Sequence, residues 1–452
     1  MKPEEIDKIK QLDKDYVWHP FTPMLDWIEG DPLIINRGEG AWIFDAEGNR
    51  YLDAVSSLWV TVHGHRHPKI DAAVRDQLDR IAHTTMLGLA NEPSALLAQR
   101  LVDIAPSGLK RVFYSDSGSE AVEIAVKIAF QYWRQCKHPR PEKNRFVTFV
   151  NAYHGDTIGS VSVGGIDLFH AMYKPLLFKS FRAPSPYCYR CELDKTYPDC
   201  SIACLDKLDD ILRENSDEIA AVICEPRVQG AAGMITAPPG HLRRVRELCD
   251  RYDVLLIADE VAVGFGRTGA MFACEVEDVT PDLMVLAKGL TGGYLPLAAT
   301  MATDRVFDAF LTRYEDRRTF YHGHTYTGNP LACAAAIANI KLFDEEKTLE
   351  RLAPRIERLR SGLDKIAKLD HVGDIRQRGV MVGIEIVKDK SNGAPFDIAE
   401  KKGARICQKA RQYGIVIRPL GDVVVLNPPL CIDNDQVDML IEAVGNSIVD
   451  EA

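Results

Sequence analysis

Short apolar runs alternate with amphipathic segments along most of the chain, from about residue 68 to residue 335. The runs lack polar alternation, which is typical of strands buried on both faces of a parallel sheet. The segments between them repeat apolar residues at helical spacing. This alternation predicts an α/β sheet with helices on both faces. We expect strands at 111–114, 146–150, 220–224, 254–258, 283–287 and 298–301, and helices at 70–81, 93–104, 121–137 and from Asn329 onward.

The two ends of the chain follow other patterns. Near the N-terminus, residues 33–35, 41–44 and 51–53 predict a small β-meander. Aromatic residues cluster around Pro20, before the meander. Their spacing alone favours an anchor in a core. The alternative is an arm that packs over another part of the protein. We expect an N-terminal arm and part of a small domain in 1–67, a large domain in 68–335, and a C-terminal small α+β domain in 336–452.

Composition and charge exclude several classes of function. The 452 residues carry a net charge of −10, which argues against a nucleic-acid partner. The longest apolar runs are strand-sized, too short for a membrane span. The first residues are acidic and lack the apolar segment of a signal peptide, so we expect a cytoplasmic location. Cysteines that stand singly in apolar runs read as small core residues of a reduced protein, namely Cys224, Cys249, Cys274 and Cys333.

Two of the expected strands end in a charged residue, the first in Asp259 and the second in Lys288. Ligands bind at the carboxyl ends of the strands in such sheets. Pyridoxal 5′-phosphate chemistry requires this pair of groups. A lysine amine condenses with the aldehyde of the cofactor, and an aspartate keeps its pyridine nitrogen protonated. Glycines after both residues allow close approach of the backbone to a flat ring. Each residue taken alone is more simply a strand end that meets solvent.

Further candidates follow other strands. Ser117, Gly118 and Ser119 lie between a strand and the start of a helix, where free N–H groups suit a phosphate. The alternative is a plain N-cap serine. Glu225 also stands at a strand end, which indicates a contact near the same ring.

The segments Asp259–Gly269 and Lys288–Gly293, together with 117–119, resemble the class-III, fold-type-I pyridoxal-phosphate aminotransferases, and the resemblance covers nearly the whole chain. It implies a large domain with a mostly parallel sheet between helices plus a smaller α+β domain. It also implies that Gly118 and Ser119 bind the cofactor phosphate and that Tyr153 stacks on the ring, rather than only covering a strand end. Thr325 matches a threonine that reaches the phosphate in the neighbouring subunit, which implies a homodimer with shared sites.

Substrate residues are implied by the same resemblance. Arg418 matches an arginine that pairs a substrate carboxylate, and its alternative is a surface ion pair. Ala231 stands where relatives acting on 4-aminobutyrate or ornithine have a glutamate, which counts against those substrates. The motifs 18–22, 56–59, 116–119 and 228–231 are most similar to the biotin-biosynthesis branch. This branch implies 8-amino-7-oxononanoate as acceptor, and Phe21 and Trp59 beside it.

The amino donor stays open between S-adenosylmethionine and lysine. The enterobacterial form, which uses S-adenosylmethionine, has other residues at the positions of Phe21, Leu58, His324 and about Val425. The runs 323–329 and 294–296 are more similar to the members that use lysine. Two other functions remain as alternatives. One is a class-III transaminase of another ω-amine, diamine or β-amino acid, and the other is a non-catalytic cofactor-binding interaction protein.

A short insert carries four cysteines, Cys188, Cys191, Cys200 and Cys204. The spacing of the pairs is typical of a structural zinc site, and the alternative is four free thiols, or one adventitious disulfide, in a loop. No catalytic metal is expected.

Overall fold

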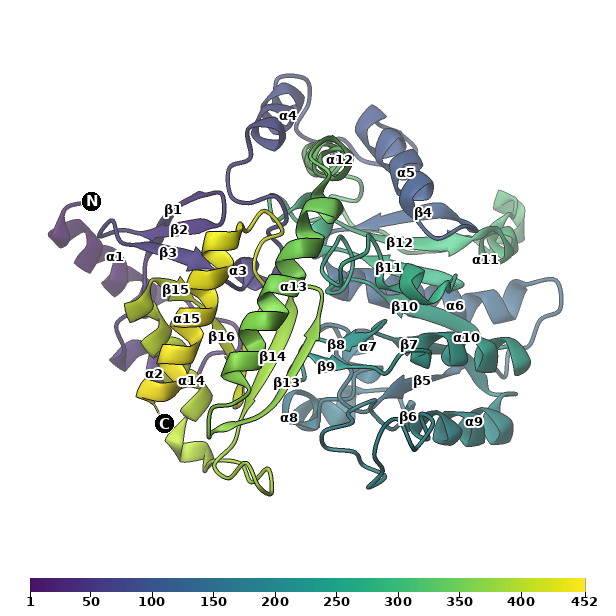
Figure 1. Ribbon diagram of the computed structural model, residues 1–452. Coiled ribbons are helices and arrows are strands. Elements are labelled where there is room, and N and C mark those ends of the chain that lie inside the picture. The colour runs from purple at the N-terminus through teal and green to yellow at the C-terminus, as the bar shows by residue number, and fades with distance from the viewer. Residues whose placement is uncertain (452) are drawn as a thin grey trace.

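A seven-stranded sheet forms the centre of the computed structural model, which describes residues 1–451 (Figure 1). Its order is β4-β12-β11-β10-β7-β5-β6. β12 pairs antiparallel with β4 and β11, whereas the remaining neighbours pair in parallel. The expected mostly parallel α/β sheet is therefore confirmed. The strands are β4 (Leu109–Ser115), β5 (Arg145–Phe149), β6 (Phe181–Ala183), β7 (Ile219–Cys224), β10 (Leu255–Asp259), β11 (Leu283–Leu286) and β12 (Ala298–Thr303).

Successive residues of the central strands are buried on opposite faces. Leu255 and Ile257 of β10 join the cluster under helix α6 (Gly118–Gln135). Leu256 and Ala258 join the cluster under α9 (Cys204–Asn215) and α10 (His241–Arg251). Burying each such leucine or isoleucine contributes roughly 1.5–3 kcal/mol, which explains why these runs contain no polar position. α5 (Glu92–Ile104) and α12 (Pro330–Glu345) pack together with β4, β11 and β12.

Three of the expected helices, α4 (Pro68–Leu78), α5 and α6, begin two, one and three residues before the expected start of their apolar stretch. α4 and α5 both have a proline in the first turn. The Asn91 side chain accepts from the N–H of Ser94, and Ser117 and Glu120 form a capping box. Caps of this kind set the helix start independently of the apolar pattern.

The smaller body combines both ends of the chain, and Figure 1 shows these ends side by side at the left. One sheet has the order β1-β2-β3-β15, and another β13-β14-β17-β16. Leu52 of β3 pairs with Ile415 of β15. The strands are β1 (Ile35–Glu39), β2 (Trp42–Asp45), β3 (Arg50–Asp53), β13 (Val372–Arg378), β14 (Met381–Ile386), β15 (Ile415–Val416), β16 (Arg418–Leu420) and β17 (Val423–Leu426), beside helices α13 (Thr348–Ile366), α14 (Lys402–Lys409) and α15 (Asn434–Asp450).

The first strand of the meander is shifted from the expected 33–35 to 35–39. β1 is a mostly exposed edge strand, so its residues can be polar and still pair with β2 through the backbone. The turn that joins β1 to β2 sets the register and places Glu39 opposite Trp42. The Arg37 guanidinium lies 3.8 Å from the centre of the Phe44 ring. Apolar content therefore does not locate this strand.

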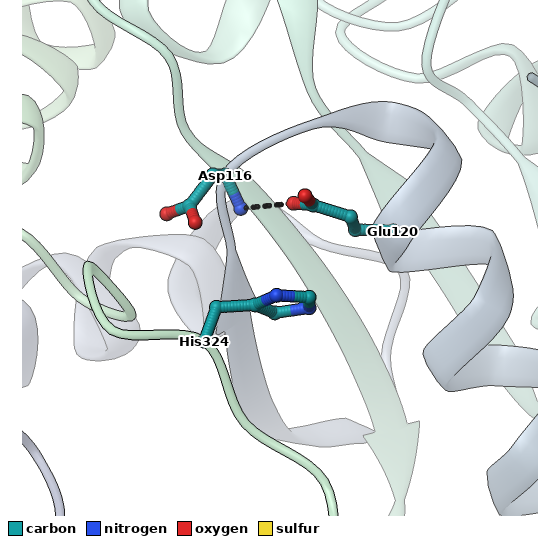
Figure 2. A group of neighbouring side chains, drawn as sticks. All are labelled: Asp116, Glu120 and His324. Atoms are coloured by element: carbon teal, nitrogen blue, oxygen red, sulfur yellow. Dashed lines mark hydrogen bonds between the residues drawn. The ribbon is translucent and has the colours of Figure 1, made fainter. Parts of the chain in front are cut away.

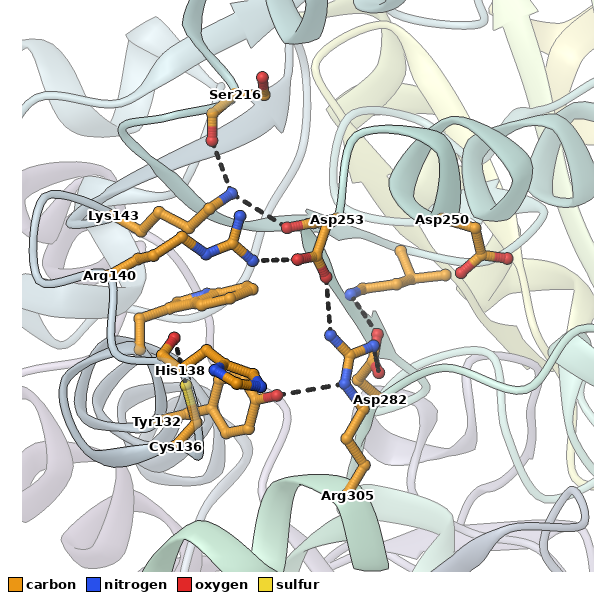
Figure 3. A network of polar contacts seen from close by, with 12 residues as sticks. Tyr132, Cys136, His138, Arg140, Lys143, Ser216, Asp250, Asp253, Asp282 and Arg305 are labelled. Atoms are coloured by element: carbon orange, nitrogen blue, oxygen red, sulfur yellow. Dashed lines mark hydrogen bonds and ion pairs between the residues drawn. The ribbon is translucent and has the colours of Figure 1, made fainter.

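A polar network closes the sheet at the amino ends of its strands (Figure 3). Lys143 is fully buried, and its Nζ donates to the carbonyls of Ser216 at 2.6 Å and Asp253 at 3.0 Å. The Asp253 carboxylate accepts from Arg140 and from Arg305, the latter at 2.8 Å. Burial lowers the pKa of Lys143 to about 8. The network thus anchors the strand starts, opposite the strand ends that carry the candidate chemistry.

Cys224, Cys249, Cys274 and Cys333 are buried and free, as expected for small core residues. Among residues 1–451, no helix has the length and apolar character needed to cross a membrane.

Candidate active site

A cavity of about 430 Å³ opens at the carboxyl ends of the central strands. Seven of the ten predicted site residues line it, and Phe21, Thr325 and Arg418 do not. The seven are Trp59, Gly118, Ser119, Tyr153, Glu225, Asp259 and Lys288.

Lys288 opens a short 3₁₀ turn directly after β11 and adopts φ 45°. A lysine in this region is strained, as is common where a side chain must be aimed at a site. Its Nζ lies 5.0 Å from the centre of the Trp59 ring. Burial lowers the pKa of Lys288, although Asp259 and Glu225 act in the opposite direction. A larger fraction of the amine is therefore neutral and nucleophilic than in an exposed lysine.

Asp259 is the last residue of β10 and is 3% exposed. Its Oδ2 lies 2.7 Å from His154 Nδ1, and its Oδ1 accepts from the N–H of Val261 at 3.0 Å. His154 is a site residue that sequence reasoning did not assign. Its only sequence signal is its place directly after Tyr153, at the end of a predicted strand.

The start of α6 forms one end of the cavity. The Ser117 side chain accepts from the N–H of Glu120, so the plain N-cap reading holds for Ser117. The first-turn N–H groups of Gly118 and Ser119 have no intrahelical acceptor. A Cβ on Gly118 would lie 2.7 Å from Val261, so only glycine fits there. These two N–H groups and the helix dipole form an anion-binding end.

Tyr153 and Ser119 are linked through Asp156. The Tyr153 hydroxyl donates to Asp156 at 2.6 Å, and Ser119 Oγ accepts from the N–H of Asp156 at 3.1 Å. Burial and Asp156 raise the pKa of Tyr153, so this phenol stays neutral. The aromatic face of the site is thereby held beside its anion-binding end.

Glu225 joins two segments of the site. Its carboxylate accepts from the N–H of Tyr153 at 3.0 Å and from that of Gly230 at 2.9 Å. Burial raises the pKa of Glu225 to about 7.

This raised pKa predicts a pH dependence that Glu225→Gln removes. A carboxyl whose pKa is higher in the folded protein contributes stability that is fully present below its ordinary pKa of 4.5 and is lost as pH rises through 7. Between pH 4.5 and 7.5, the free energy of unfolding of the cofactor-free protein should fall by on the order of 2 kcal/mol relative to the variant. Urea titrations at several pH values measure it, with the exposed Glu214→Gln as control. Parallel curves for Glu225→Gln and wild type would contradict the assignment.

Two carboxylates and an imidazole meet beside the start of α6 (Figure 2). The ligand-type atoms of Asp116, Glu120 and His324 lie within 4.8 Å of one another. Glu120 Oε2 accepts from the N–H groups of Asp116 and Ser117, both at 2.9 Å. Burial and Glu120 raise the pKa of Asp116. This contact brings the segment that carries the exposed Thr325 next to the anion-binding end.

The four insert cysteines are free thiols. Among residues 1–451, no group of three or more metal-ligating atoms within that distance includes any of them.

An apolar wall closes another side of the cavity. Trp59, Ala262 and Val425 belong to one buried cluster, and Ala231 packs against it. Arg418 faces Val425 across the β16–β17 ladder. Arg418 is half-buried.

Arg267 holds this wall in place and was not predicted to have a role. Its guanidinium is fully buried and donates to Ser56 Oγ at 3.0 Å, to the Thr61 carbonyl at 2.8 Å and to the Pro428 carbonyl at 2.9 Å. Trp59 lies between these anchors with φ 64°. Arg267 therefore ties the strained loop of Trp59 to the C-terminal part of the chain.

The N-terminal aromatics do not form an anchor in a core. Trp18 is 87% exposed and Phe21 57% exposed, because the segment interrupted by Pro20 runs over the surface of the chain. The Phe21 ring packs edge-on against Phe169 at 5.4 Å, and Phe169 packs edge-on against Tyr153 at 6.3 Å. The arm thus contacts the site through one intermediate ring.

Comparisons with known proteins agree with this geometry. Residues 28–448 match the family model described as aminotransferase class-III. An adenosylmethionine-8-amino-7-oxononanoate aminotransferase of Nitratidesulfovibrio vulgaris is 56% identical over 98% of this chain and 82% of its own length. The crystal structure of the Methanocaldococcus jannaschii protein of that name has a TM-score of 0.93 at 44% identity, covering 98% of this chain and 99% of the other. An ω-transaminase from Pseudomonas jessenii in complex with PMP has a TM-score of 0.93 at 32% identity over 98% of each chain.

Proposed function

Because the chain belongs to the class-III aminotransferases, we propose that it transfers an amino group to 8-amino-7-oxononanoate, giving 7,8-diaminononanoate in biotin biosynthesis. Near full-length relatives at 52–56% identity are named for this acceptor and for S-adenosylmethionine. The observation in the structure that carries the proposal is the meeting of Lys288, Asp259 and an anion-binding helix start in one cavity.

Pyridoxal 5′-phosphate, the cofactor of this family, fits the residues present. Lys288 would hold its aldehyde, Asp259 its pyridine nitrogen, and Gly118 and Ser119 its phosphate. Two buried polar atoms in the cavity wall, Trp59 Nε1 and His154 Nε2, have no hydrogen-bond partner within residues 1–451. When bound, the cofactor supplies the carbonyl that takes up the amino group and a ring that accepts an electron pair.

The chain's own groups then move the proton and exclude water. The neutral Lys288 Nζ would remove a proton from the donor carbon as general base and then, as general acid, give it to the former carbonyl carbon of the cofactor. The Asp259 carboxylate holds a proton on the nitrogen of the ring. Tyr153 would lie against one face of the ring and Trp59 on the substrate side, and both would limit access of water. Arg418 would pair the acceptor carboxylate, and Phe21 would close the site from outside.

A half-reaction tests this function. The cofactor-loaded protein is mixed separately with S-adenosylmethionine and with L-lysine, without acceptor, and the visible absorbance of the bound cofactor is followed. We expect S-adenosylmethionine alone to bleach it and 8-amino-7-oxononanoate to restore it. Bleaching by lysine alone would assign the other donor. If neither bleaches it, the biotin-pathway proposal fails and a class-III transaminase of another ω-amine takes its place.

The proposal includes a homodimer with shared sites, in which Thr325 reaches the phosphate of the partner's cofactor. It is supported by the exposure of Thr325 and of large aromatic side chains nearby in the single chain, Tyr314, Tyr321 and Tyr326.

The proposal also includes a cytoplasmic location, which is supported by the eleven free cysteines. It further includes a division of the chain into domains at 1–67, 68–335 and 336–452.

Subunit mixing tests the shared site. Co-expressing chains with Lys288→Ala and chains with Thr325→Asp places both changes in one site of each mixed dimer and leaves its other site intact. Random pairing then restores about a quarter of wild-type activity, although each variant alone is inactive. No recovery would show that each site is built from one chain.

A further inference from the structure

A short hairpin packs against Trp59, which lines the cavity. It is formed by β8 (Val228–Gln229) and β9 (Ile235–Thr236), which pair antiparallel. Met234, in the turn between them, belongs to the same buried cluster as Trp59. A Cβ on Gly230 would lie 3.1 Å from the Trp59 ring, so the turn touches the indole closely. The position of this turn therefore limits how far Trp59 can move away from the cavity.

Arg376 holds the turn with two of its three guanidinium nitrogens. This residue lies on β13 and is 6% exposed. Its Nε and Nη2 both donate to the carbonyl of Gly233, at 3.1 Å and 2.8 Å. Met234, the next residue, adopts φ 56°. A residue with a side chain keeps this conformation only where surrounding contacts hold it. The two bonds from Arg376 are contacts of this kind.

The third nitrogen of Arg376 fixes the orientation of the guanidinium. Nη1 lies 2.5 Å from Glu385 Oε2 and 2.8 Å from Asp374 Oδ2, and it donates to the Tyr187 hydroxyl at 3.0 Å. Glu385 is 5% exposed and also accepts from the Tyr187 hydroxyl and, at 2.6 Å, from Arg190 Nε. Burial acts to raise the pKa of Glu385, but these hydrogen bonds outweigh burial and lower the pKa, so the carboxylate stays charged.

The same contacts give the four-cysteine insert a place in the molecule. Arg190 lies within this insert and Tyr187 directly before it, and both bind the carboxylate that holds Arg376. Ser185, slightly earlier, donates from Oγ to Gln229 Oε1 of the hairpin at 2.6 Å. The segment that leads into the insert therefore contacts the hairpin directly and also through Arg376.

We propose that Arg376 is a positioning residue that holds the β8–β9 turn against Trp59 and thereby sets the width of the cavity on the substrate side. The inference rests on the proposed function, because it places the acceptor beside Trp59. Without the two bonds to Gly233, the turn can move back and the indole can follow it, so the acceptor binds less tightly. Lys288 and Asp259 follow other strands and keep their positions.

Arg376→Lys separates the charge from the two bonds to the turn. The variant keeps a positive charge beside Glu385, but one ammonium group does not replace a fork that reaches Glu385 and Gly233 together. At saturating donor, we expect the KM of the acceptor to rise about 3- to 30-fold, as the loss of one or two hydrogen bonds would cause. We expect kcat and the dissociation constant of the cofactor to stay within about threefold of wild type. Steady-state rates and a cofactor titration followed by visible absorbance measure these values.

Hydrogen exchange followed by mass spectrometry reports on the turn without any substrate. We expect the segment 228–237 to exchange at least about tenfold faster in Arg376→Lys than in wild type, because the turn opens more often. If the wild-type protein fails the half-reaction, the proposed substrates fall. Exchange in 228–237 then decides by itself whether Arg376 holds the turn.

The control is Arg246→Lys. Arg246 lies on α10, and its mostly buried guanidinium pairs with Asp282 at 2.8 Å. This variant should lower the unfolding temperature without changing the KM of the acceptor or the exchange of 228–237. An unchanged KM or unchanged exchange in folded Arg376→Lys would overturn the proposal, as would an equal rise of KM in Arg246→Lys. Should Arg376→Lys fail to fold, the double variant Arg376→Gln with Glu385→Gln removes both buried charges together and carries the same expectation.

Discussion

Lys288→Ala should abolish transamination, with kcat lowered by on the order of 10⁴-fold or more. The variant removes both the amine that would bond to the cofactor and the base that would move the substrate proton. Lys288 already adopts φ 45°, so alanine adds no new backbone strain at this position. Steady-state rates with 8-amino-7-oxononanoate as acceptor measure the effect.

The matched control is Lys207→Ala, an exposed lysine on α9. It should retain wild-type activity and the same cofactor absorbance. The unfolding temperature of cofactor-free Lys288→Ala should match that of wild type. Substantial turnover in a correctly folded Lys288→Ala would refute the assignment of Lys288.

Asp259→Asn should lower kcat by about 10³-fold with little change in the KM of the acceptor. The substitution keeps the volume of the side chain but removes the charge that would hold a proton on the ring nitrogen. Removing one preorganised electrostatic group from an active site typically lowers kcat by about 10²- to 10³-fold. The amide can accept from only one of its two donors, His154 or Val261, so the free energy of unfolding should fall by roughly 1–2 kcal/mol. Single-turnover absorbance separates this chemical step from product release.

Asp210→Asn, an exposed carboxylate on α9, serves as control. A second outcome is informative. If Asp259→Asn binds the cofactor weakly and regains its rate at saturating cofactor, Asp259 acts in binding alone. A rate above about a tenth of wild type without added cofactor would contradict both roles.

Much of the sheet could be predicted because its signal is local. Each strand is buried on both faces, so its run of apolar residues is uninterrupted, as at Leu255–Ala258. The position of Asp259 and Lys288 follows from the same pattern, since the carboxyl ends of neighbouring parallel strands meet at one edge. The cofactor therefore followed from two short segments and their glycines, and the class of reaction followed from their resemblance to the class-III aminotransferases.

Contacts between distant segments gave no such signal. Arg267 is separated from its partner Pro428 by most of the C-terminal half of the chain, and a single arginine in an apolar motif does not indicate which carbonyls surround it. His154 likewise acquires its partner only when β5 and β10 share a sheet. The strand β1 was expected at 33–35 instead of 35–39, and the aromatic residues around Pro20 were expected in a core rather than in the exposed arm, for a related reason, because neither segment buries an apolar face.

The pairing of Leu52 with Ile415 has a consequence for synthesis of the protein. The chain leaves the ribosome from its N-terminus, so the fourth strand of the first sheet appears roughly 360 residues after the third. At 5–20 residues per second this delay is about 20–70 s. Most residues that line the cavity, from Asp116 to Leu297, are complete well before then. The nascent chain can therefore assemble the strand ends that carry Asp259 and Lys288 before the apolar wall that includes Val425 exists.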